Sequence, residues 1–180
     1  GNAVNDLLAS ELAVATLTDT SLPNLPALPT QPADPSADAR LQLLTEGAIR
    51  DALLATLNHS QAGDQIDVSV FYLSHRPLME ALLAAQQRGV QLRVLLDPNK
   101  DAFGREKNGI PNRQVGHELH NAGIPVRWCN TQGEQCHTKM LLRRSANSAE
   151  LILGSANYTR RNLDNLNLDC LLYTSDAADD

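Results

Sequence analysis

Apolar and polar side chains alternate in distinct patterns along the middle of the chain, and these patterns predict helices and strands in turn. Apolar residues at helical spacing predict helices over 46–58 and 74–88, and alternating apolar residues predict strands over 66–73 and 91–96. The second helix ends at Gly89, a residue type that tolerates the left-handed conformation at helix ends. The order strand, helix, strand is typical of a parallel pair with a right-handed crossover.

The same alternation continues after a polar loop over 97–111. It predicts a helix over 112–121, a short strand over 125–129, and a hairpin with strands over 137–143 and 150–153. We therefore expect an α/β fold, a layered α/β/α sandwich with a mixed, largely parallel sheet.

The N-terminal flank has a different pattern. We predict a helix over 5–16 with Asn5 as its N-cap. Prolines then recur at every third position, which favours an extended segment over packed structure; they are Pro23, Pro26, Pro29, Pro32 and Pro35. This segment is either a disordered tail or a linker to a preceding lobe. On the second interpretation residues 1–20 are a remnant helix of that lobe, 21–39 are the linker, and 40–169 are the main lobe.

Charge is distributed unevenly, and this changes what the net charge of -6 implies. Residues 1–39 hold five acidic side chains and no Lys or Arg, and residues 170–180 hold three acids and no base. The middle of the chain holds 15 basic against 13 acidic side chains and can therefore meet an anionic substrate. The last segment, CLLYTSDAADD, resembles a translated sequencing adapter. We leave it out of the fold as a non-native tail, the alternative being a genuine acidic tail.

The three cysteines, Cys129, Cys136 and Cys170, are too few and too oddly spaced for a disulfide framework or a paired metal site. We expect Cys136 to be a small buried apolar residue, and Trp128 and Cys129 to pack in the core. No apolar run approaches the roughly 20 residues of a membrane-spanning helix.

Two short motifs near the predicted hairpin carry candidate chemistry. His137 and Lys139 stand two apart on a strand, so an imidazole and an ammonium share one face. The return strand ends in Gly154, Ser155, Ala156 and Asn157, a turn of small residues that the hairpin brings back beside His137. Its backbone, hydroxyl and amide donors suit an anion. Further on, Asn167 and Asp169 lie on a β-like stretch, where a carboxylate can hold one imidazole nitrogen.

The order His-x-Lys, Gly-Ser-x-Asn, Asn-x-acid resembles the motif of the phospholipase D superfamily over residues 40–169. Three segments resemble its bacterial phospholipase D-like and cardiolipin-synthase-like branch: GDQIDVSVFYLS, RGVQLRVLLDPNKDAFGREKNGIPN and GEQCHTKMLL. The resemblance implies that His137 is one of two catalytic histidines, that Lys139 and Asn157 bind the substrate phosphate, and that Asp169 orients His137. It implies no metal or other cofactor.

The implied reaction is phosphodiester hydrolysis or phosphatidyl transfer on phospholipids through a phosphohistidine. We expect a protein peripheral to a bacterial membrane. A scarcity of aromatic residues for stacking bases favours lipid over nucleic acid; the six are Phe71, Tyr72, Phe103, Trp128, Tyr158 and Tyr173. The alternatives are a nuclease that acts on DNA as a homodimer, and a degenerate, non-catalytic lobe used for binding.

The sequence departs from the family motif in two ways. The motif usually has Asp five residues after the Lys, where this chain has Arg144. In addition there is only one His-x-Lys, and we expect surface positions for the remaining histidines, which are His59, His75, His117 and His120. A second half-site would come from an upstream lobe of the same protein, which we favour, or from a homodimer mate, as in the small one-motif nucleases. We expect this chain alone to be inactive unless it dimerises.

Basic side chains gather at the end of the predicted strand over 91–96, where α/β sheets commonly bind ligands; they are Lys100, Arg105, Lys107 and Arg113. We expect Arg105 and Lys107 to hold a second phosphate or a headgroup, the alternative being a solvated loop. Phosphate contacts or ordinary surface charge are likewise open for four further arginines, Arg143, Arg144, Arg160 and Arg161.

Overall fold

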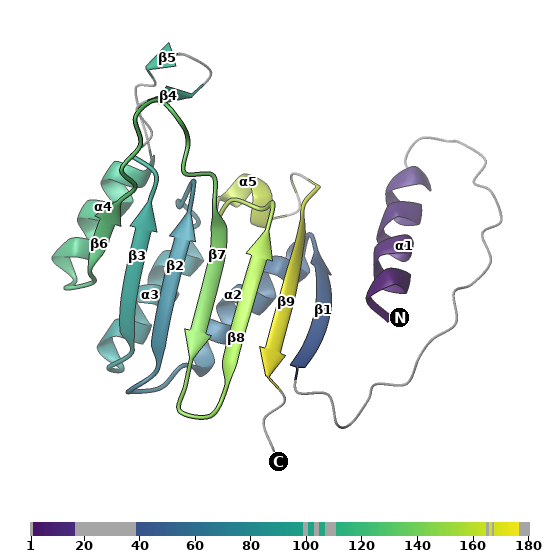
Figure 1. The fold of residues 1–180 in the computed structure, drawn as a ribbon, viewed down its shortest axis with the longest axis horizontal. Coiled ribbons are helices and arrows are strands. Elements are labelled where there is room, and N and C mark those ends of the chain that lie inside the picture. Colours follow the sequence, from purple (N-terminus) through teal and green to yellow (C-terminus); the bar gives the residue numbers. More distant parts are fainter. Residues whose placement is uncertain are drawn as a thin grey trace.

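A computed structural model describes residues 2–16, 39–98, 101–102, 105–106, 111–164, 166 and 168–176. Its centre is a seven-stranded sheet in the order β1-β9-β8-β7-β2-β3-β6 (Figure 1). The strands are β1 (Ala39–Thr45), β2 (Gln65–Val70), β3 (Gln91–Leu96), β6 (Val126–Trp128), β7 (Lys139–Arg144), β8 (Ala149–Gly154) and β9 (Cys170–Asp176). The short strands β4 (Asp101–Ala102) and β5 (Arg105–Glu106) pair separately. The helices are α1 (Asn2–Ala15), α2 (Gly47–His59), α3 (Arg76–Gln87), α4 (Pro111–Asn121) and α5 (Arg160–Leu163).

The predicted crossover units are confirmed in the part of the sheet that ends at β6. β2 pairs with β3 and β3 with β6 in parallel, with α3 and α4 as the connecting helices. Gly89 has a positive φ of 89° where α3 ends, as its residue type predicts. The remaining pairs, β2 with β7, β7 with β8, β8 with β9 and β9 with β1, are antiparallel. The mixed α/β sheet is therefore confirmed, with its parallel pairing confined to three strands.

One apolar core joins the sheet to its helices. Alternate residues of β2 and β3 are buried against α2, α3 and α4, and they are Ile66, Val68, Val70, Leu92, Val94 and Leu96. Figure 1 shows α2 and α3 behind the sheet and α1 standing beside β1. Side chains of opposite parity point to the other face, where Leu41, Leu153 and Leu172 are exposed. This face is the more polar at β2, where it carries Asp67.

Besides the short strands β4 and β5, the sequence pattern misses two strands of the main sheet, and these lie at its β1 end. Residues 170–176, which the sequence analysis leaves out of the fold, form β9 between β8 and β1. The helix predicted over 5–16 begins at Asn2, so Asn5 lies within α1 and not at its N-cap. The proline segment lies outside the described residues except for its last residue, Ala39. The division of the chain into a remnant helix, a linker and a lobe stays a prediction.

Candidate active site

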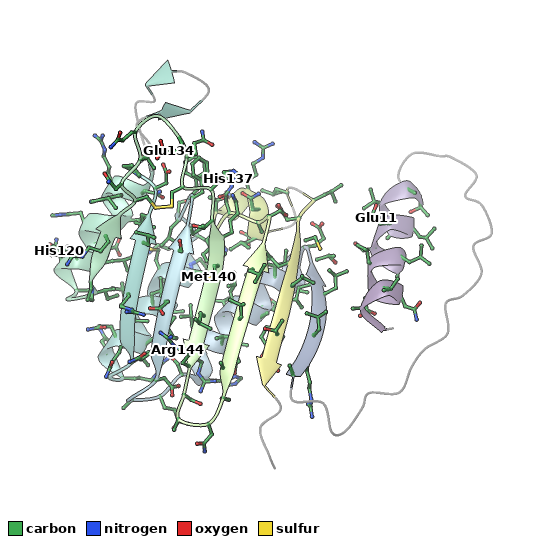
Figure 2. The ribbon with its side chains drawn as sticks, viewed as in Figure 1. Glu11, His120, Glu134, His137, Met140 and Arg144 are labelled. Carbon is green, nitrogen blue, oxygen red and sulfur yellow. A yellow bond between two sulfur atoms is a disulfide. The ribbon has the colours of Figure 1, made fainter. Side chains whose placement is uncertain are left out.

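The His-x-Lys pair lies where β7 begins, at the end of the sheet opposite Arg144 (Figure 2). His137 is exposed and lies two residues before the strand, not on it as predicted, whereas Lys139 opens the strand and is only 5% exposed. The Lys139 ammonium donates a hydrogen bond to the His137 carbonyl oxygen at 2.9 Å. It also lies 5.4 Å from the centroid of the Phe71 ring, a cation–π contact. The buried ammonium is therefore held at the backbone of the residue that carries the exposed imidazole.

The end of β2 fixes this segment on its other side. The Phe71 N–H donates to the Thr138 carbonyl at 2.8 Å, and the hydroxyls of Ser69 and Thr138 are 2.6 Å apart. The Phe71 and His137 rings pack with their centroids 4.8 Å apart. Contacts from β2 thus continue the β2–β7 ladder past Lys139 to the residue next to the imidazole.

Two carboxylates act on the charges of this pair. Partial burial, followed by the Lys139 charge, lowers the pKa of His137 from its ordinary value, and the Asp97 charge opposes this. Burial lowers the pKa of Lys139, and the Asp169 charge opposes that shift. Because the ordinary pKa of histidine is about 6.5, a lowered pKa leaves the His137 imidazole mostly neutral near pH 7. A neutral imidazole has a ring nitrogen that can act as a nucleophile.

The Gly-Ser-x-Asn turn follows β8 and returns to the same edge. β7 and β8 pair Met140 with Leu153, so the residues after Leu153 lie beside those before Met140. The Tyr158 N–H donates to the Tyr72 carbonyl at 2.9 Å, which brings the neighbouring Asn157 to the end of β2. The Asn157 Oδ1 is buried without a hydrogen-bond partner in the described part of the chain. Its Nδ2 is the atom that can donate to a phosphate oxygen.

Gly154 and Ser155 both contact the start of β9. A Cβ on Gly154 would collide with the Cys170 carbonyl oxygen and with Leu171, so this close strand approach requires glycine. The Ser155 hydroxyl donates to Asp169 Oδ1 at 3.1 Å. Their predicted contact with an anion stays a prediction.

Asp169 lies close to the pair but is not bonded to the imidazole. Its carboxylate accepts hydrogen bonds from Ser155 and from Asn162 Nδ2 at 2.8 Å. Within the described residues neither ring nitrogen of His137 has a hydrogen-bond partner. Sequence reasoning missed Asn162, which is 9% exposed on α5, because no motif position marks it. The structure thus brings Asp169 together with Ser155 and Lys139, and Asn167 lies outside the described residues.

Two further buried polar residues support the site from below, and sequence reasoning missed both. Asp97 directly follows β3, is 3% exposed, and accepts a hydrogen bond from the Cys136 N–H at 2.6 Å. Asn112 is fully buried and donates to the Phe71 and Asp97 carbonyls at 2.7 and 3.0 Å, while it accepts from the Leu73 N–H at 2.9 Å. The signal that marks Asp97 is its place at the carboxyl end of a parallel strand.

The loop before His137 corrects three predictions. Cys129 and Cys136 form a disulfide, and both are half-buried instead of packed in the core. Trp128 is 44% exposed and rests on Gly116 of α4. The physical reason is that β6 is a short edge strand, so the residues at its end reach the surface instead of the core. The spacing of the two cysteines in the sequence did not predict the disulfide, because the path of the loop between them determines whether their sulfur atoms meet.

Two arginines predicted as possible phosphate ligands are paired with carboxylates at the far end of the hairpin. Arg143 lies 2.9 Å from Asp64 and 2.7 Å from Glu150, and Arg144 lies 2.8 Å from Asp67. Arg144 lies remote from His137 in Figure 2, and Arg143 is its neighbour at the same end of β7, which favours structural charge pairs over phosphate contacts for both.

The remaining basic residues predicted as possible phosphate ligands are exposed or have side chains outside the described part of the chain. Arg160 and Arg161 are exposed on α5. Lys100 and Lys107 lie outside the described residues, and so does the side chain of Arg105, whose backbone forms part of β5. The expected role of Arg105 and Lys107 therefore stays a prediction.

The other histidines do not offer a second half-site. His75 is 2% exposed, which corrects its predicted surface position, and its Nε2 lies 3.1 Å from Asp164 Oδ1. It is buried because it precedes α3 beneath the Tyr158 backbone, whose carbonyl accepts its N–H. The exposed positions predicted for the remaining three, His59, His117 and His120, are confirmed.

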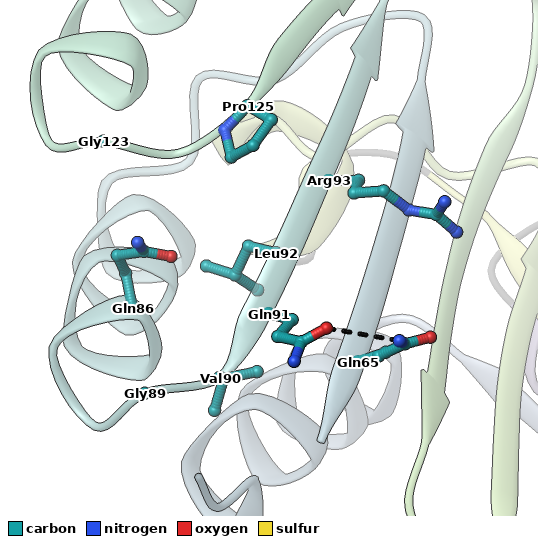
Figure 3. A pocket seen from close by; sticks show the side chains of 9 residues that line it. All are labelled: Gln65, Gln86, Gly89, Val90, Gln91, Leu92, Arg93, Gly123 and Pro125. Carbon is teal, nitrogen blue, oxygen red and sulfur yellow. Dashed lines mark hydrogen bonds between the residues drawn. The ribbon is translucent and has the colours of Figure 1, made fainter. Parts of the chain in front are cut away.

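Two pockets on the described part of the molecule are not lined by His137 or Lys139. One of about 510 Å³ lies at the start of β3, lined by Gln65, Gln86, Gln91, Arg93 and the Gly89 and Gly123 turns (Figure 3). Another, of about 420 Å³, lies on the sheet face opposite the helices, with Asp67, Arg127 and Met140 among its lining residues.

In the part of the chain described, no group of three or more His, Cys, Asp or Glu side chains is arranged to hold a metal ion. None of the described helices has the length and apolar content needed to cross a bilayer.

The sheet, with a histidine and lysine at the start of one strand and a Gly-Ser-x-Asn turn after its neighbour, defines the phospholipase D class of fold. Residues 53–179 match the family described as "Cardiolipin synthase, PLD-like domain". The chain therefore belongs to the phospholipase D-like family. No curated protein sequence matches it significantly.

Solved structures share this fold at low sequence identity. Nuc from Salmonella typhimurium, a phospholipase D family member, is 21% identical with a TM-score of 0.62, over 77% of this chain and 84% of its own. NucT from Helicobacter pylori is 15% identical with a TM-score of 0.58, over 78% of this chain and 87% of its own. Polyphosphate kinase from Porphyromonas gingivalis is 16% identical with a TM-score of 0.52, over 74% of this chain and 23% of its own.

Proposed function

We propose that this chain supplies one half-site of an enzyme that cleaves phosphodiesters through a phosphohistidine on His137. The observation that carries the proposal is the contact between the exposed imidazole segment and the buried Lys139 ammonium. That ammonium makes one hydrogen bond in the described part of the chain, so its other N–H groups can meet a phosphate oxygen. The Asn157 amide follows β8 to the same edge and would add a further donor.

The reaction would run in two displacements. A His137 ring nitrogen attacks phosphorus and forms a P–N bond, while the bond from phosphorus to the leaving oxygen breaks. A second histidine donates a proton to that oxygen, and general acid catalysis of this kind raises the rate roughly 100- to 10,000-fold. Water or an alcohol then attacks phosphorus, the P–N bond breaks, and the second histidine takes the proton of the attacking hydroxyl. Lys139 and Asn157 would neutralise the nonbridging oxygens in both steps.

The second histidine must come from outside this motif. We favour an upstream lobe of the same protein, with a homodimer mate as the alternative. The exposed Leu41 and Leu153 on the sheet face opposite the helices support association of either kind, because exposed apolar side chains favour burial. Asp169 would act on Lys139, whose ammonium its charge stabilises.

Phospholipid is the substrate class that we propose first, because the matching family is described as a cardiolipin synthase. DNA cleavage is the second candidate, and the exposed Trp128 favours it. The indole is 44% exposed on the strand that leads to the Cys129–Cys136 loop before His137, so an aromatic face is available for stacking a base. Lipid cleavage should respond to vesicles or micelles, whereas DNA binding should weaken steeply as salt rises.

Trapping the covalent intermediate tests the proposal. The intact protein is incubated with a phosphodiester carrying labelled phosphorus, given as a phospholipid in micelles or as an oligonucleotide, and then quenched in base, where phosphohistidine survives. We expect label on His137 and its loss in His137→Asn. The matched control is His117→Asn, an exposed histidine on α4, which should keep the label. Label that persists in His137→Asn on another histidine would assign the attack to the partner imidazole. Absence of label with both substrates would favour a non-catalytic binding lobe.

A further inference from the structure

A buried carboxylate lies beside the His137 segment without belonging to the family motif. Asp97 directly follows β3 and is 3% exposed, so its charge is removed from water. One of its oxygens, Oδ2, accepts the Cys136 N–H at 2.6 Å. A hydrogen bond of this length from an amide to a carboxylate is a strong, charge-assisted one. Cys136 is the residue immediately before His137, so the backbone at the imidazole is attached to the end of β3.

Asp97 is itself held by the rest of the fold. Its carbonyl accepts from Asn112 Nδ2 at 3.0 Å, and the same amide group donates to the Phe71 carbonyl at 2.7 Å. Phe71 in turn donates its N–H to the Thr138 carbonyl. The backbone on both sides of His137 is therefore connected, through Asp97 on one side and Phe71 on the other, to one fully buried Asn112 side chain.

A covalent link closes the same loop. The Cys129–Cys136 disulfide joins the residue after β6 to the residue before His137, across a sequence separation of seven. The Cys129 N–H donates to the Leu96 carbonyl at 2.9 Å, next to Asp97. Cys136 is thus held at its sulfur by the end of β6 and at its amide by the end of β3. Such double attachment is what a reacting side chain needs, because small displacements of a catalytic group are costly.

We propose that Asp97 is a positioning residue for His137, acting through the Cys136 amide and as the nearby buried negative charge. The inference deepens the proposed function, because it concerns the imidazole that we propose as the nucleophile. The contact of Asp97 is with the backbone beside His137, whereas the carboxylate of Asp169, which the motif resemblance links to the imidazole, accepts hydrogen bonds from Ser155 and Asn162. Asp169 would then serve Lys139, and each member of the pair would have its own carboxylate.

The charges around His137 agree with this division. Lys139 on β7 lowers the pKa of His137, and Asp97 after β3 opposes that effect. Asp169 before β9 acts on Lys139. Glu134, in the loop before His137, accepts the Gln132 N–H at 2.9 Å. Removal of the Asp97 charge should therefore lower the pKa of His137, whereas removal of the Glu134 charge should leave it nearly unchanged.

Proton NMR of the histidine rings tests the proposal on the chain as it exists, without any need for turnover. The His137 signal is identified by its loss in His137→Gln and followed as a function of pH. Asp97→Asn keeps an oxygen that can accept the Cys136 N–H and removes the charge. We expect its His137 midpoint at lower pH than in the unchanged protein. Glu134→Gln is the matched control, and Asp169→Asn should move the midpoint less than Asp97→Asn does.

Amide hydrogen exchange measures the positioning contact separately. We expect the Cys136 amide to be protected in the unchanged protein, and to exchange about tenfold faster or more in Asp97→Ala, which lacks the acceptor. Asp97→Asn should keep most of the protection. An unprotected Cys136 amide in the unchanged protein, or a His137 midpoint that moves with Asp169→Asn and not with Asp97→Asn, would overturn the proposal. Neither readout uses labelled substrate, so failure here is distinct from failure of the phosphohistidine proposal.

Discussion

Lys139 combines two properties that rarely occur together in a lysine, burial and an apolar neighbour beneath its charge. It is 5% exposed and lies over the Phe71 ring, so the ammonium has lost most of its hydration. Water that is already displaced does not have to leave when an anion binds, which favours a phosphate oxygen as the replacement. The lowered pKa of this lysine follows from the same burial, and the Asp169 charge limits the shift.

Replacement of this lysine should separate its chemical from its structural role. In Lys139→Met the apolar stem stays, so we expect a folded protein with a similar free energy of unfolding. Formation of the labelled phosphohistidine should fall by about 100-fold or more, because one charged donor to the transition state is missing. The measurements are the rate of labelling and a urea unfolding curve. A Met variant that labels at the normal rate would show that Lys139 does not contact the phosphate.

The pH dependence of labelling should report the His137 imidazole. Burial and the Lys139 charge lower its pKa, so the neutral, nucleophilic form persists to lower pH than in a free histidine. We therefore expect the acidic limb of the labelling rate to lie below pH ~6.5, the ordinary value. The rate is measured from about two units below to about two units above the ordinary value, roughly pH 4.5 to 8.5, in buffers of equal ionic strength. A limb above the ordinary value would contradict the role given to His137.

At the residue scale the sequence predicted the members of the motif and missed their supports. His137, Lys139 and Asn157 are recognisable because their spacing along a hairpin already fixes their proximity. Asp97 and Asn112 act through partners more than 10 residues away, such as Phe71 and Cys136, and no spacing predicts those contacts. The disulfide was missed for the same reason, since the path of the loop after β6 brings its two sulfur atoms together.

Between elements, one side chain joins three segments beneath the site. Asn112 is the second residue of α4, and its side chain forms hydrogen bonds with the backbone after β2 at Phe71 and Leu73 and with the backbone after β3 at Asp97. Each of these groups would lose this hydrogen bond if the amide were removed, and the loss of a buried hydrogen bond costs about 1–3 kcal/mol where the group is left unsatisfied. The carboxyl ends of β2 and β3 therefore depend on a residue from the helix that follows.

Asn112→Leu tests this connection. We expect the free energy of unfolding to fall by about 3 kcal/mol, because three hydrogen bonds of a fully buried side chain are lost. Asn121→Leu is the matched control on the same helix, where the amide is exposed and should cost about 0.5 kcal/mol or less. Urea unfolding followed by circular dichroism measures both. Equal losses in the two variants would mean that the connection contributes little to stability.

The β7–β8 hairpin shows how the missing motif aspartate is replaced. Arg144 lies 2.8 Å from Asp67 on β2, which Arg93 on β3 also pairs. These arginines lower the pKa of the Asp67 carboxyl, with the Arg93 hydrogen bond as the main cause. The arginine at this position therefore belongs to a charge cluster across three strands. It is compatible with an intact half-site, because the cluster lies at the end of β7 remote from His137 (Figure 2).

Restoration of the family residue should consequently harm this protein. In Arg144→Asp the new carboxylate would face Asp67, and like charges on neighbouring strands repel. We expect Arg144→Ala to lose at most about 1 kcal/mol of stability, since the guanidinium is 43% exposed, and Arg144→Asp to lose about 1 kcal/mol more. Because the Asp67 pKa is lowered in the folded state, its stabilisation is present above its unfolded pKa and is lost as pH falls through the folded value. Urea midpoints that rise in Arg144→Asp would contradict this account.

The elements themselves were predicted where the pattern was strong and local. The helices over 46–58, 74–88 and 112–121 and the strand over 91–96 were found nearly to the residue, because each has a regular apolar face and a clear end. β1 and β9 were missed. They lie at one end of the sheet and pair with each other, so their strand conformation depends on a partner more than 120 residues away in sequence.

For the molecule as a whole, the lone His-x-Lys is the feature that most limits function. The described part of the chain holds the remaining histidines either exposed, as His59, His117 and His120 are, or buried against Asp164, as His75 is. His75 follows β2 near this edge, but its ring is buried and held by Asp164, so it is not available as a second catalytic imidazole. If cleavage runs through two histidines, as proposed, turnover would require a second polypeptide surface, and the sheet face opposite the helices exposes leucines that such a surface would cover.

Turnover by this chain in isolation should therefore come only from pairs of chains. Below the dissociation constant of the pair, the concentration of pairs rises as the square of the protein concentration, and so should the rate of cleavage of a labelled phosphodiester.

Mixtures with His137→Asn at constant total protein offer a second measure of the same requirement. A site that needs both imidazoles is lost whenever either chain carries Asn, so the rate should follow the square of the fraction of unchanged chain. Addition of His117→Asn in place of His137→Asn should leave the rate constant, because that imidazole is exposed on α4 and is not part of the His-x-Lys motif. A rate that is linear in both protein concentration and fraction would mean that one imidazole suffices, and the paired site would have to be abandoned.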